Sequence, residues 1–90
     1  MNESRDELSV CLGKDEKIYA IGGFGTANQE SLKSVEVFDL KTEKWSYAPS
    51  LKTARRALAA ATLADGIYAI GGFDGRHHLS SVEKYEEGSR

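Results

Sequence analysis

Hydrophobic positions recur along the chain in short runs, separated by polar and glycine-rich connections. The heptapeptide IYAIGGF occupies residues 18–24 and returns at 67–73, 49 positions later. In its first six residues both faces of an extended chain are apolar or small, so the pattern predicts a strand that is covered on both faces. Two such strands predict two copies of one structural unit.

The repeat continues beyond the heptapeptide. The sequence SVEVF at 34–38 has a similar counterpart, SVEKY, at 81–85, at an offset of 47. The offset changes because the connection 25–33 has nine residues and the connection 74–80 has seven. Framework segments keep their lengths while a connection varies, which is typical of exposed loops.

Alternating patterns predict the remaining strands. The valines of 35–40 alternate with Glu36 and Phe38, and Trp45 and Tyr47 alternate with polar neighbours. Each unit is therefore predicted to be an antiparallel sheet, and the second unit has no counterpart of the fourth strand. The predicted strands are 8–12, 17–23, 34–40 and 44–48 in the first unit and 57–63, 67–72 and 81–86 in the second.

The segment 56–63 (RALAAATL) is ambiguous, because alanine and leucine favour a helix by local propensity. Asp65-Gly66 follows it directly and is a tight-turn signal that leads into the strand beginning at Ile67. We therefore predict a hairpin of 58–63 with 67–72 rather than a helix.

The order of strand, Gly-Gly, loop, strand with an aromatic residue, and then Trp resembles the kelch repeat, over residues 8–86. The form IYAIGGFDG followed by LSSVEKYE is similar in particular to kelch repeats of animal BTB-kelch proteins. Glycine permits positive φ and close backbone approach, and the aromatic residues supply large apolar area between blades. The motif residues are Gly22, Gly23, Phe38 and Trp45 in the first unit and Gly71, Gly72 and Tyr85 in the second.

The resemblance implies an all-β fold with one β-propeller blade per unit, one blade complete and the other incomplete. Two blades leave an apolar face open on either side, so we expect further kelch blades or self-association to cover them. The predicted organisation is a polar N-terminal extension at 1–7, a first repeat at 8–50, a second repeat at 51–86 and a polar tail at 87–90.

Composition and charge exclude several classes of partner. The chain is 40% hydrophobic and 29% charged with a formal net charge of -2, as in an ordinary globular domain. Without a basic excess, nucleic acid and membrane surfaces are not expected as partners. Neither a secretory pattern nor an apolar stretch of about 18 residues occurs, and Cys11 is the single cysteine. We expect Cys11 to be a small apolar strand residue and the protein to be cytoplasmic.

The sequence offers little catalytic chemistry. His77 and His78 are adjacent on a short loop, where two histidines seldom converge on one metal. The glycine-rich stretches 22–25 and 71–74 lead into no helix that could present its amides to a phosphate. We therefore predict no catalytic residue, metal or cofactor. Some kelch-like propellers are copper oxidases or sugar isomerases, but the Cys-Tyr-His set expected for the oxidase is missing here.

Function is therefore expected on the connections 24–33, 49–56 and 73–80, which the resemblance places at one mouth of the ring, where relatives bind peptide segments. The resemblance also places Arg55 where an arginine often contacts acidic ligand groups, through two parallel hydrogen bonds. The alternative, that Arg55 pairs with a nearby carboxylate or lies solvated, stays open. The other candidate contacts are Arg56, Arg76, His77, Phe73, Asp74, Phe24 and Asn28.

The resulting hypothesis is a non-enzymatic protein-interaction module that captures an acidic or polar segment of a protein partner. The likeness to BTB-kelch proteins implies that the parent protein is a substrate adaptor of a cullin-based ubiquitin ligase. Actin binding, known for some kelch proteins, is the alternative.

Overall fold

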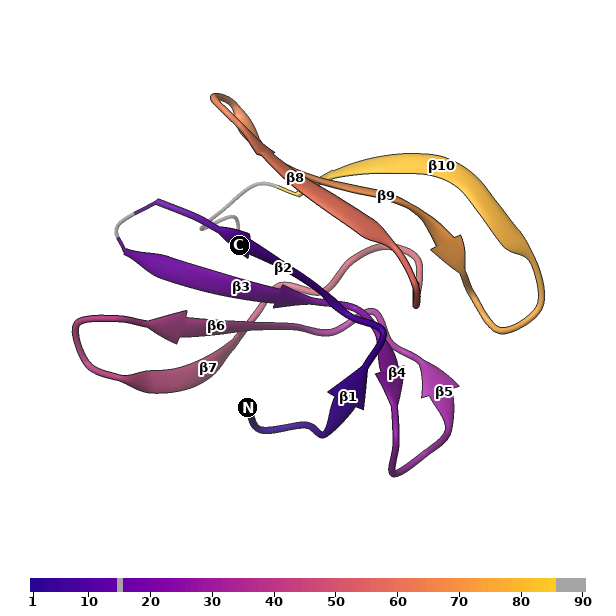
Figure 1. The fold of residues 1–90 in the computed structure, drawn as a ribbon, viewed down its shortest axis with the longest axis horizontal. Helices are drawn as coiled ribbons and strands as arrows, with labels where there is room; N and C mark the ends of the chain where they lie inside the picture. The colour runs from indigo at the N-terminus through magenta and orange to yellow at the C-terminus, as the bar shows by residue number, and fades with distance from the viewer. Residues whose placement is uncertain (15, 86–90) are drawn as a thin grey trace.

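The computed structural model describes residues 1–14 and 16–85, and within this part all regular elements are β-strands. Two larger antiparallel sheets lie side by side, with a small sheet at one end of them (Figure 1). The strand orders are β2-β3-β6-β7, β10-β9-β8 and β1-β4-β5. The all-β prediction is confirmed. No helix among the described residues could cross a lipid bilayer.

The four-stranded sheet is blade 1 and the larger three-stranded sheet is blade 2. Blade 1 contains β2 (Ser9–Leu12), β3 (Lys17–Ile21), β6 (Val35–Asp39) and β7 (Lys44–Ala48). Blade 2 contains β8 (Ala59–Leu63), β9 (Gly66–Phe73) and β10 (His78–Tyr85). The small sheet contains β1 (Arg5–Asp6), β4 (Phe24–Gly25) and β5 (Glu30–Ser31). The predicted end of the second repeat, 86, and the tail 87–90 lie outside the described residues.

The ambiguous alanine-rich segment forms β8, so the predicted hairpin is present and the helical alternative is excluded. β8 pairs with β9 from Ala59 opposite Ile70 to Leu63 opposite Gly66. The turn itself is Ala64-Asp65, one residue earlier than the Asp65-Gly66 predicted. Pairing with an apolar neighbouring strand outweighs local helix propensity, because propensity differences are small compared with tertiary contacts.

The two blades correspond residue by residue. Ser9 pairs with Ile21 as Ala59 pairs with Ile70, so residues of blade 2 follow their counterparts by 50 in the first strand and by 49 in the second. In the third strand the offset is 47, because Tyr85 lies opposite Ile67 as Phe38 lies opposite Ile18. The chain therefore changes length only in the connections between strands.

The main core lies between the blades. Tyr19 of blade 1 and Tyr85 of blade 2 meet edge to face with ring centroids 5.9 Å apart. The lone cysteine, Cys11, is buried in this core as expected. Burial of apolar surface on the facing sides holds the blades together. The core consists of Cys11, Tyr19, Ile21, Val35, Val37, Leu51, Ile67, Ala69 and Tyr85.

The Tyr85 hydroxyl donates a hydrogen bond of 2.6 Å to the carbonyl of Pro49, which ties blade 2 to the connection that leaves blade 1. We expect Tyr85→Phe to lower the free energy of unfolding by about 1 kcal/mol, because a partly buried carbonyl loses its donor. Urea denaturation measures the change. Tyr68→Phe is the control: it removes an exposed hydroxyl bonded to Asp65 and should have less effect. Equal losses for the two variants would contradict the assignment.

The connection after β3 forms the hairpin β4–β5, and the N-terminal segment joins it as β1. Arg5 pairs with Gly25 and Asp6 with Phe24. Residues 1–7, predicted as a polar extension, therefore lie within the fold. In Figure 1 this small sheet lies at the end of blade 1 that also faces the connection between β9 and β10.

Candidate functional site at the mouth between the blades

The chain between β7 and β8 passes between the blades and is fixed by backbone hydrogen bonds to both. The N–H of Gly23 donates to the carbonyl of Arg55 at 2.7 Å, and the N–H of Arg55 donates to the carbonyl of Leu32 at 2.9 Å. Arg56 and Phe73 exchange two hydrogen bonds of 2.9 Å. Two adjacent arginines are thereby held where the connections of both blades meet.

Both glycine pairs permit this close approach. Gly22 and Gly23 have φ of +62° and +103°, and Gly71 and Gly72 have +66° and +102°. A Cβ on Gly22 would lie 2.6 Å from the Arg55 carbonyl oxygen, too close for any side chain. The predicted reason for glycine therefore applies directly at the connection between the blades.

Arg55, the leading candidate for ligand binding, is fully buried. Its Nη1 donates to the carbonyls of Gly71 and Ser81, both at 3.0 Å, and its Nε donates to the Glu83 carboxylate at 3.2 Å. Its Nη2 donates to the Ser81 hydroxyl at 2.9 Å. The guanidinium therefore has no free edge for a ligand, and the alternative of pairing with a nearby carboxylate describes its place. We therefore no longer consider Arg55 a candidate ligand contact.

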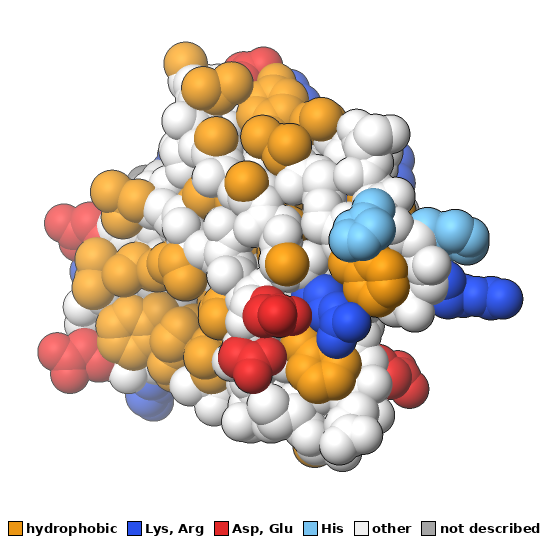
Figure 2. Space-filling model, turned by 45° about the vertical axis from the view of Figure 1, so that its right-hand side comes forward, with side chains coloured by type: hydrophobic (Ala, Val, Ile, Leu, Met, Phe, Trp, Pro, Cys, Tyr) orange, Lys and Arg blue, Asp and Glu red, His pale blue; other side chains and the backbone are white. Residues whose placement is uncertain are grey.

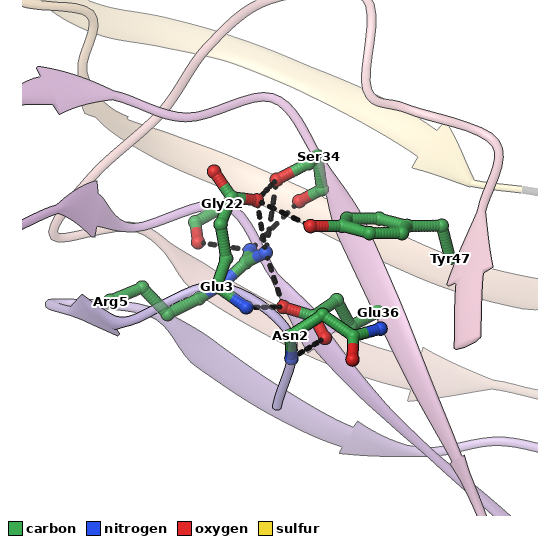
Figure 3. Close-up of polar contacts among 7 residues, drawn as sticks. All are labelled: Asn2, Glu3, Arg5, Gly22, Ser34, Glu36 and Tyr47. Carbon is green, nitrogen blue, oxygen red and sulfur yellow. Dashed lines mark hydrogen bonds and ion pairs between the residues drawn. The ribbon is translucent and has the colours of Figure 1, made fainter. Parts of the chain in front are cut away.

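Arg5, 50 residues earlier, bonds to the corresponding residues of blade 1, but its Nη2 rather than its Nε reaches the glutamate (Figure 3). Its Nη1 donates to the carbonyls of Gly22 and Ser34 at 2.8 and 3.0 Å. Its Nη2 lies 2.9 Å from the Glu36 carboxylate, and both side chains are fully buried. We call this arrangement, a buried arginine bonded to a motif glycine, a serine and a glutamate, the arginine clasp.

The glutamate of each clasp also accepts two backbone hydrogen bonds. The N–H groups of Asn2 and Glu3 donate to Glu36, as those of Lys52 and Thr53 donate to Glu83. In addition, Glu3 accepts hydrogen bonds from Arg5, Ser34 and Tyr47. Residues 1–7 are thus the structural counterpart of 51–57, with a clasp that anchors them to blade 1.

Arg56, unlike Arg55, is only partly buried. Its guanidinium carbon lies 4.7 Å from the centroid of the Phe24 ring and 4.9 Å from that of Phe73, so one cation is held by an aromatic ring from each blade. Its side chain is 30% exposed, and Glu7 is 3.9 Å away, beyond hydrogen-bond distance. Figure 2 shows basic, apolar and acidic side chains gathered on this face.

Only some of the other predicted ligand contacts lie close to Arg56. The Asp74 carboxylate accepts hydrogen bonds of 2.8 Å from the backbone N–H groups of both His77 and Arg76, which lower its pKa. Asp74 therefore shapes its turn, as expected. Arg76, His77 and Asn28 are exposed. Phe24, Arg56, Asp74 and Arg76 line one surface hollow of about 470 Å³, to which His77 and Asn28 do not contribute.

The sequence interpretation missed three residues. Arg5 could have been found, because R-x-x-L occurs at Arg5 and again at Arg55, with the same spacing of 50 that separates the first strands. Glu7 and His78 had no such signal. The His78 ring packs on Phe73 with centroids 5.0 Å apart. We call Phe24, Arg56, Phe73, Asp74, Arg76 and His78 the mouth surface.

The mouth surface carries no evident metal chemistry. Within residues 1–14 and 16–85, no three or more His, Cys, Asp or Glu side chains gather in a way that could hold a metal ion. An arginine between aromatic rings instead offers a fixed cation with planar hydrogen-bond donors, which suits recognition of carboxylates.

Comparison with known proteins agrees with this architecture. The Kelch motif matches residues 9–52 and again 54–87. The chain belongs to the Kelch motif family. It is 44% identical to human Kelch-like protein 28 over 85 residues, which is 88% of this chain and 15% of that protein. It is 42% identical to mouse Kelch-like protein 8 over 69 residues, 77% of this chain and 11% of the relative.

A third relative, the spermatocyte protein spe-26 of Caenorhabditis elegans, is 41% identical over 90 residues, 94% of this chain and 16% of that protein. The kelch chain thus spans less than a fifth of the length of these curated relatives. The first kelch match contains the strands of blade 1 and the second contains those of blade 2. Membership of this family supports a role as a protein-interaction module.

Proposed function

We propose that the mouth surface binds a short acidic segment of a protein partner. The observation that carries this proposal is the position of Arg56, held between Phe24 and Phe73 with 30% of its side chain exposed. Its rotamers are restricted before a ligand arrives, so less conformational entropy is lost on binding. Arg76 adds a second cation at the same hollow, which the carboxylates of Asp74 and Glu30 also line.

An incoming carboxylate would compete with Glu7 for Arg56. Glu7 is 53% exposed and does not reach hydrogen-bond distance, so this contact is weak. A ligand carboxylate approaching the open edge of the guanidinium can form two parallel, charge-assisted hydrogen bonds. The aromatic rings on either side offer apolar contact to neighbouring residues of the peptide.

Fluorescence polarisation with labelled peptides tests the proposal. We expect Glu-rich peptides to bind the kelch chain, matched Gln peptides to bind more weakly, and added salt to reduce the difference. Arg56→Ala should weaken acidic-peptide binding about 10-fold or more, since hydrogen bonds to charged groups contribute roughly 1.5–3 kcal/mol. Lys41→Ala removes an equal charge at the β6–β7 turn, away from the mouth surface. Equal binding by wild type and Arg56→Ala would refute the proposal.

We further propose a cytoplasmic role as a substrate adaptor of a cullin-based ubiquitin ligase. The support is its similarity to two Kelch-like proteins over most of its length. Co-precipitation of a cullin with the full-length protein tests the role. Co-sedimentation of the same protein with filamentous actin, without cullin capture, would favour a cytoskeletal role instead.

A further inference from the structure

Arg56 lines two hollows of the surface, and both of them also contain carboxylates. The hollow of about 470 Å³ contains Glu30 and Asp74. A second hollow, of about 400 Å³, contains Glu7 beside Phe73. Arg56 is the residue that the two hollows share. A peptide segment whose carboxylate reaches Arg56 therefore places its neighbouring residues close to carboxylates of the protein.

The ion pair between Arg56 and Glu7 is loose, so Arg56 can exchange partners. The two side chains are 30% and 53% exposed, and the 3.9 Å between Arg56 Nε and Glu7 Oε1 is too long for a hydrogen bond. The backbone of Glu7 is fixed, because its carbonyl accepts a hydrogen bond of 2.8 Å from the N–H of Ala57. When a ligand carboxylate takes Arg56, Glu7 therefore stays near the incoming anion without its cation.

The charges around the two hollows do not favour a run of acidic residues. Arg56 and Arg76 supply two cations, whereas Glu7, Glu30 and Asp74 supply three carboxylates. Two backbone N–H groups bond to the Asp74 carboxylate, but the exposed Glu30 carboxylate has no ion pair within the described part of the chain. An additional ligand carboxylate would be repelled by these groups, and a ligand cation would be attracted.

We infer that the bound segment carries a single acidic residue with a basic residue next to it, rather than a run of acidic residues. This inference rests on the proposed binding of a carboxylate by Arg56. The ligand carboxylate takes Arg56 from Glu7, and the ligand cation pairs with Glu7 in return, so each charge keeps a partner. A basic residue on the opposite flank can pair with Glu30 in the same way.

The hollow beside Glu7 also suits the body of a long basic side chain. Phe73 and His78 line it, with ring centroids 5.0 Å apart, and Ala57 adds a small apolar contact. Lysine and arginine bury their methylene stems along apolar surface while the charged end stays in water or meets a carboxylate. The half-exposed Glu7 provides that carboxylate at the same hollow.

Fluorescence polarisation with labelled peptides that differ only in a central triplet tests the inference. We expect Lys-Glu-Lys to bind about 2- to 5-fold more tightly than Gln-Glu-Gln, as one or two exposed ion pairs would give. Glu-Glu-Glu should bind more weakly than Gln-Glu-Gln but more tightly than Gln-Gln-Gln. A peptide with the composition of the Lys-Glu-Lys peptide, but with both lysines at its ends, should bind like Gln-Glu-Gln, which separates neighbouring charge from net charge.

Glu7→Gln identifies the partner of the ligand cation. It should weaken binding of Lys-Glu-Lys and strengthen binding of Glu-Glu-Glu, because glutamine neither attracts the cation nor repels the anion. Misfolding would weaken both peptides, so opposite changes exclude it. Glu43→Gln removes the same charge on the exposed β6–β7 turn and should change neither. Glu30→Gln repeats the test at the other hollow.

The outcomes separate this inference from the proposed function. If Gln-Glu-Gln binds no better than Gln-Gln-Gln, or binds equally to wild type and Arg56→Ala, the proposed function is wrong and the inference fails with it. If Gln-Glu-Gln binds through Arg56 but Lys-Glu-Lys gains nothing over it, only the inference is overturned. Retention of the full Lys-Glu-Lys advantage in Glu7→Gln would overturn it as well.

Discussion

Replacement of Arg55 by alanine should lower the free energy of unfolding by about 3–5 kcal/mol, the usual effect of removing one partner of a buried ion pair. Arg55 is fully buried and Glu83 is only 13% exposed, so the remaining carboxylate would keep much of its desolvation penalty without its cation. The carbonyls of Gly71 and Ser81 would also lose a donor. Urea denaturation followed by circular dichroism, at one fixed protein concentration, measures the loss.

Arg56→Ala is the matched control, because the two arginines are neighbours in sequence and differ in burial. Arg56 is partly exposed and contacts aromatic rings and a distant carboxylate, so its removal should cost about 1 kcal/mol or less. Arg55→Ala should therefore lower the free energy of unfolding strongly, whereas Arg56→Ala should weaken peptide binding with little loss of stability. A larger loss of stability for Arg56→Ala than for Arg55→Ala would show that the clasp has been misassigned.

Arg55→Lys gives a second measure of the clasp. Lysine keeps the positive charge but lacks the planar fork that reaches Glu83, Ser81 and the Gly71 carbonyl together. We expect it to recover only part of the loss. Full recovery would mean that charge alone, and not the hydrogen-bond geometry, holds the connection.

The second large effect is expected for Gly22→Ala. The left-handed φ of +62° costs a residue with a Cβ about 1–2 kcal/mol. The new Cβ would also lie 2.6 Å from the Arg55 carbonyl oxygen, and displacing a tightly bonded backbone adds about 1–3 kcal/mol. The total destabilisation by Gly22→Ala should therefore be similar to that by Arg55→Ala.

Comparison with Gly71→Ala separates the cost of the steric clash from the cost of the left-handed backbone conformation. Gly71 has nearly the same φ, +66°, but its nearest neighbour, the Leu79 carbonyl oxygen, is 3.4 Å from the position of a Cβ. Only the conformational cost of about 1–2 kcal/mol should remain. Urea denaturation of both variants gives the difference directly. Equal destabilisation would show that the clash at Gly22 is relieved without cost.

The strands of the two blades could be predicted from the sequence, because hydrophobic periodicity and the repeat determine them together. The small sheet of β1, β4 and β5 could not, because its strands lie in segments without that pattern. Even the alanine-rich β8 followed from the turn signal after it, although its local propensity favours a helix. The roles of the two arginines could not be predicted. Arg55 and Arg56 are adjacent, and only the path of the backbone between the blades decides which one points inward to Glu83.

The residues of the mouth surface, apart from His78, are candidates from the sequence, but their contacts could not be predicted. Phe24 and Phe73 end the two copies of the same heptapeptide, so their similar positions followed from the repeat. That both rings contact one arginine depends on how the blades are placed side by side, which periodicity does not specify. The contacts of residues 1–7 could not be predicted for a related reason: a polar segment gives no hydrophobic pattern, whereas its anchor is a buried ion pair.

The position of the clasp ahead of each blade has a practical consequence for dissecting or recombining these repeats. A piece cut to begin at Leu8 would keep Glu36 in the sheet but lose Arg5 and the backbone N–H groups of Asn2 and Glu3 that bond to it. Cutting between Ser50 and Leu51 instead gives modules that each carry their own counter-ion. Transplanted units should therefore be exchanged as 1–50 and 51 onward.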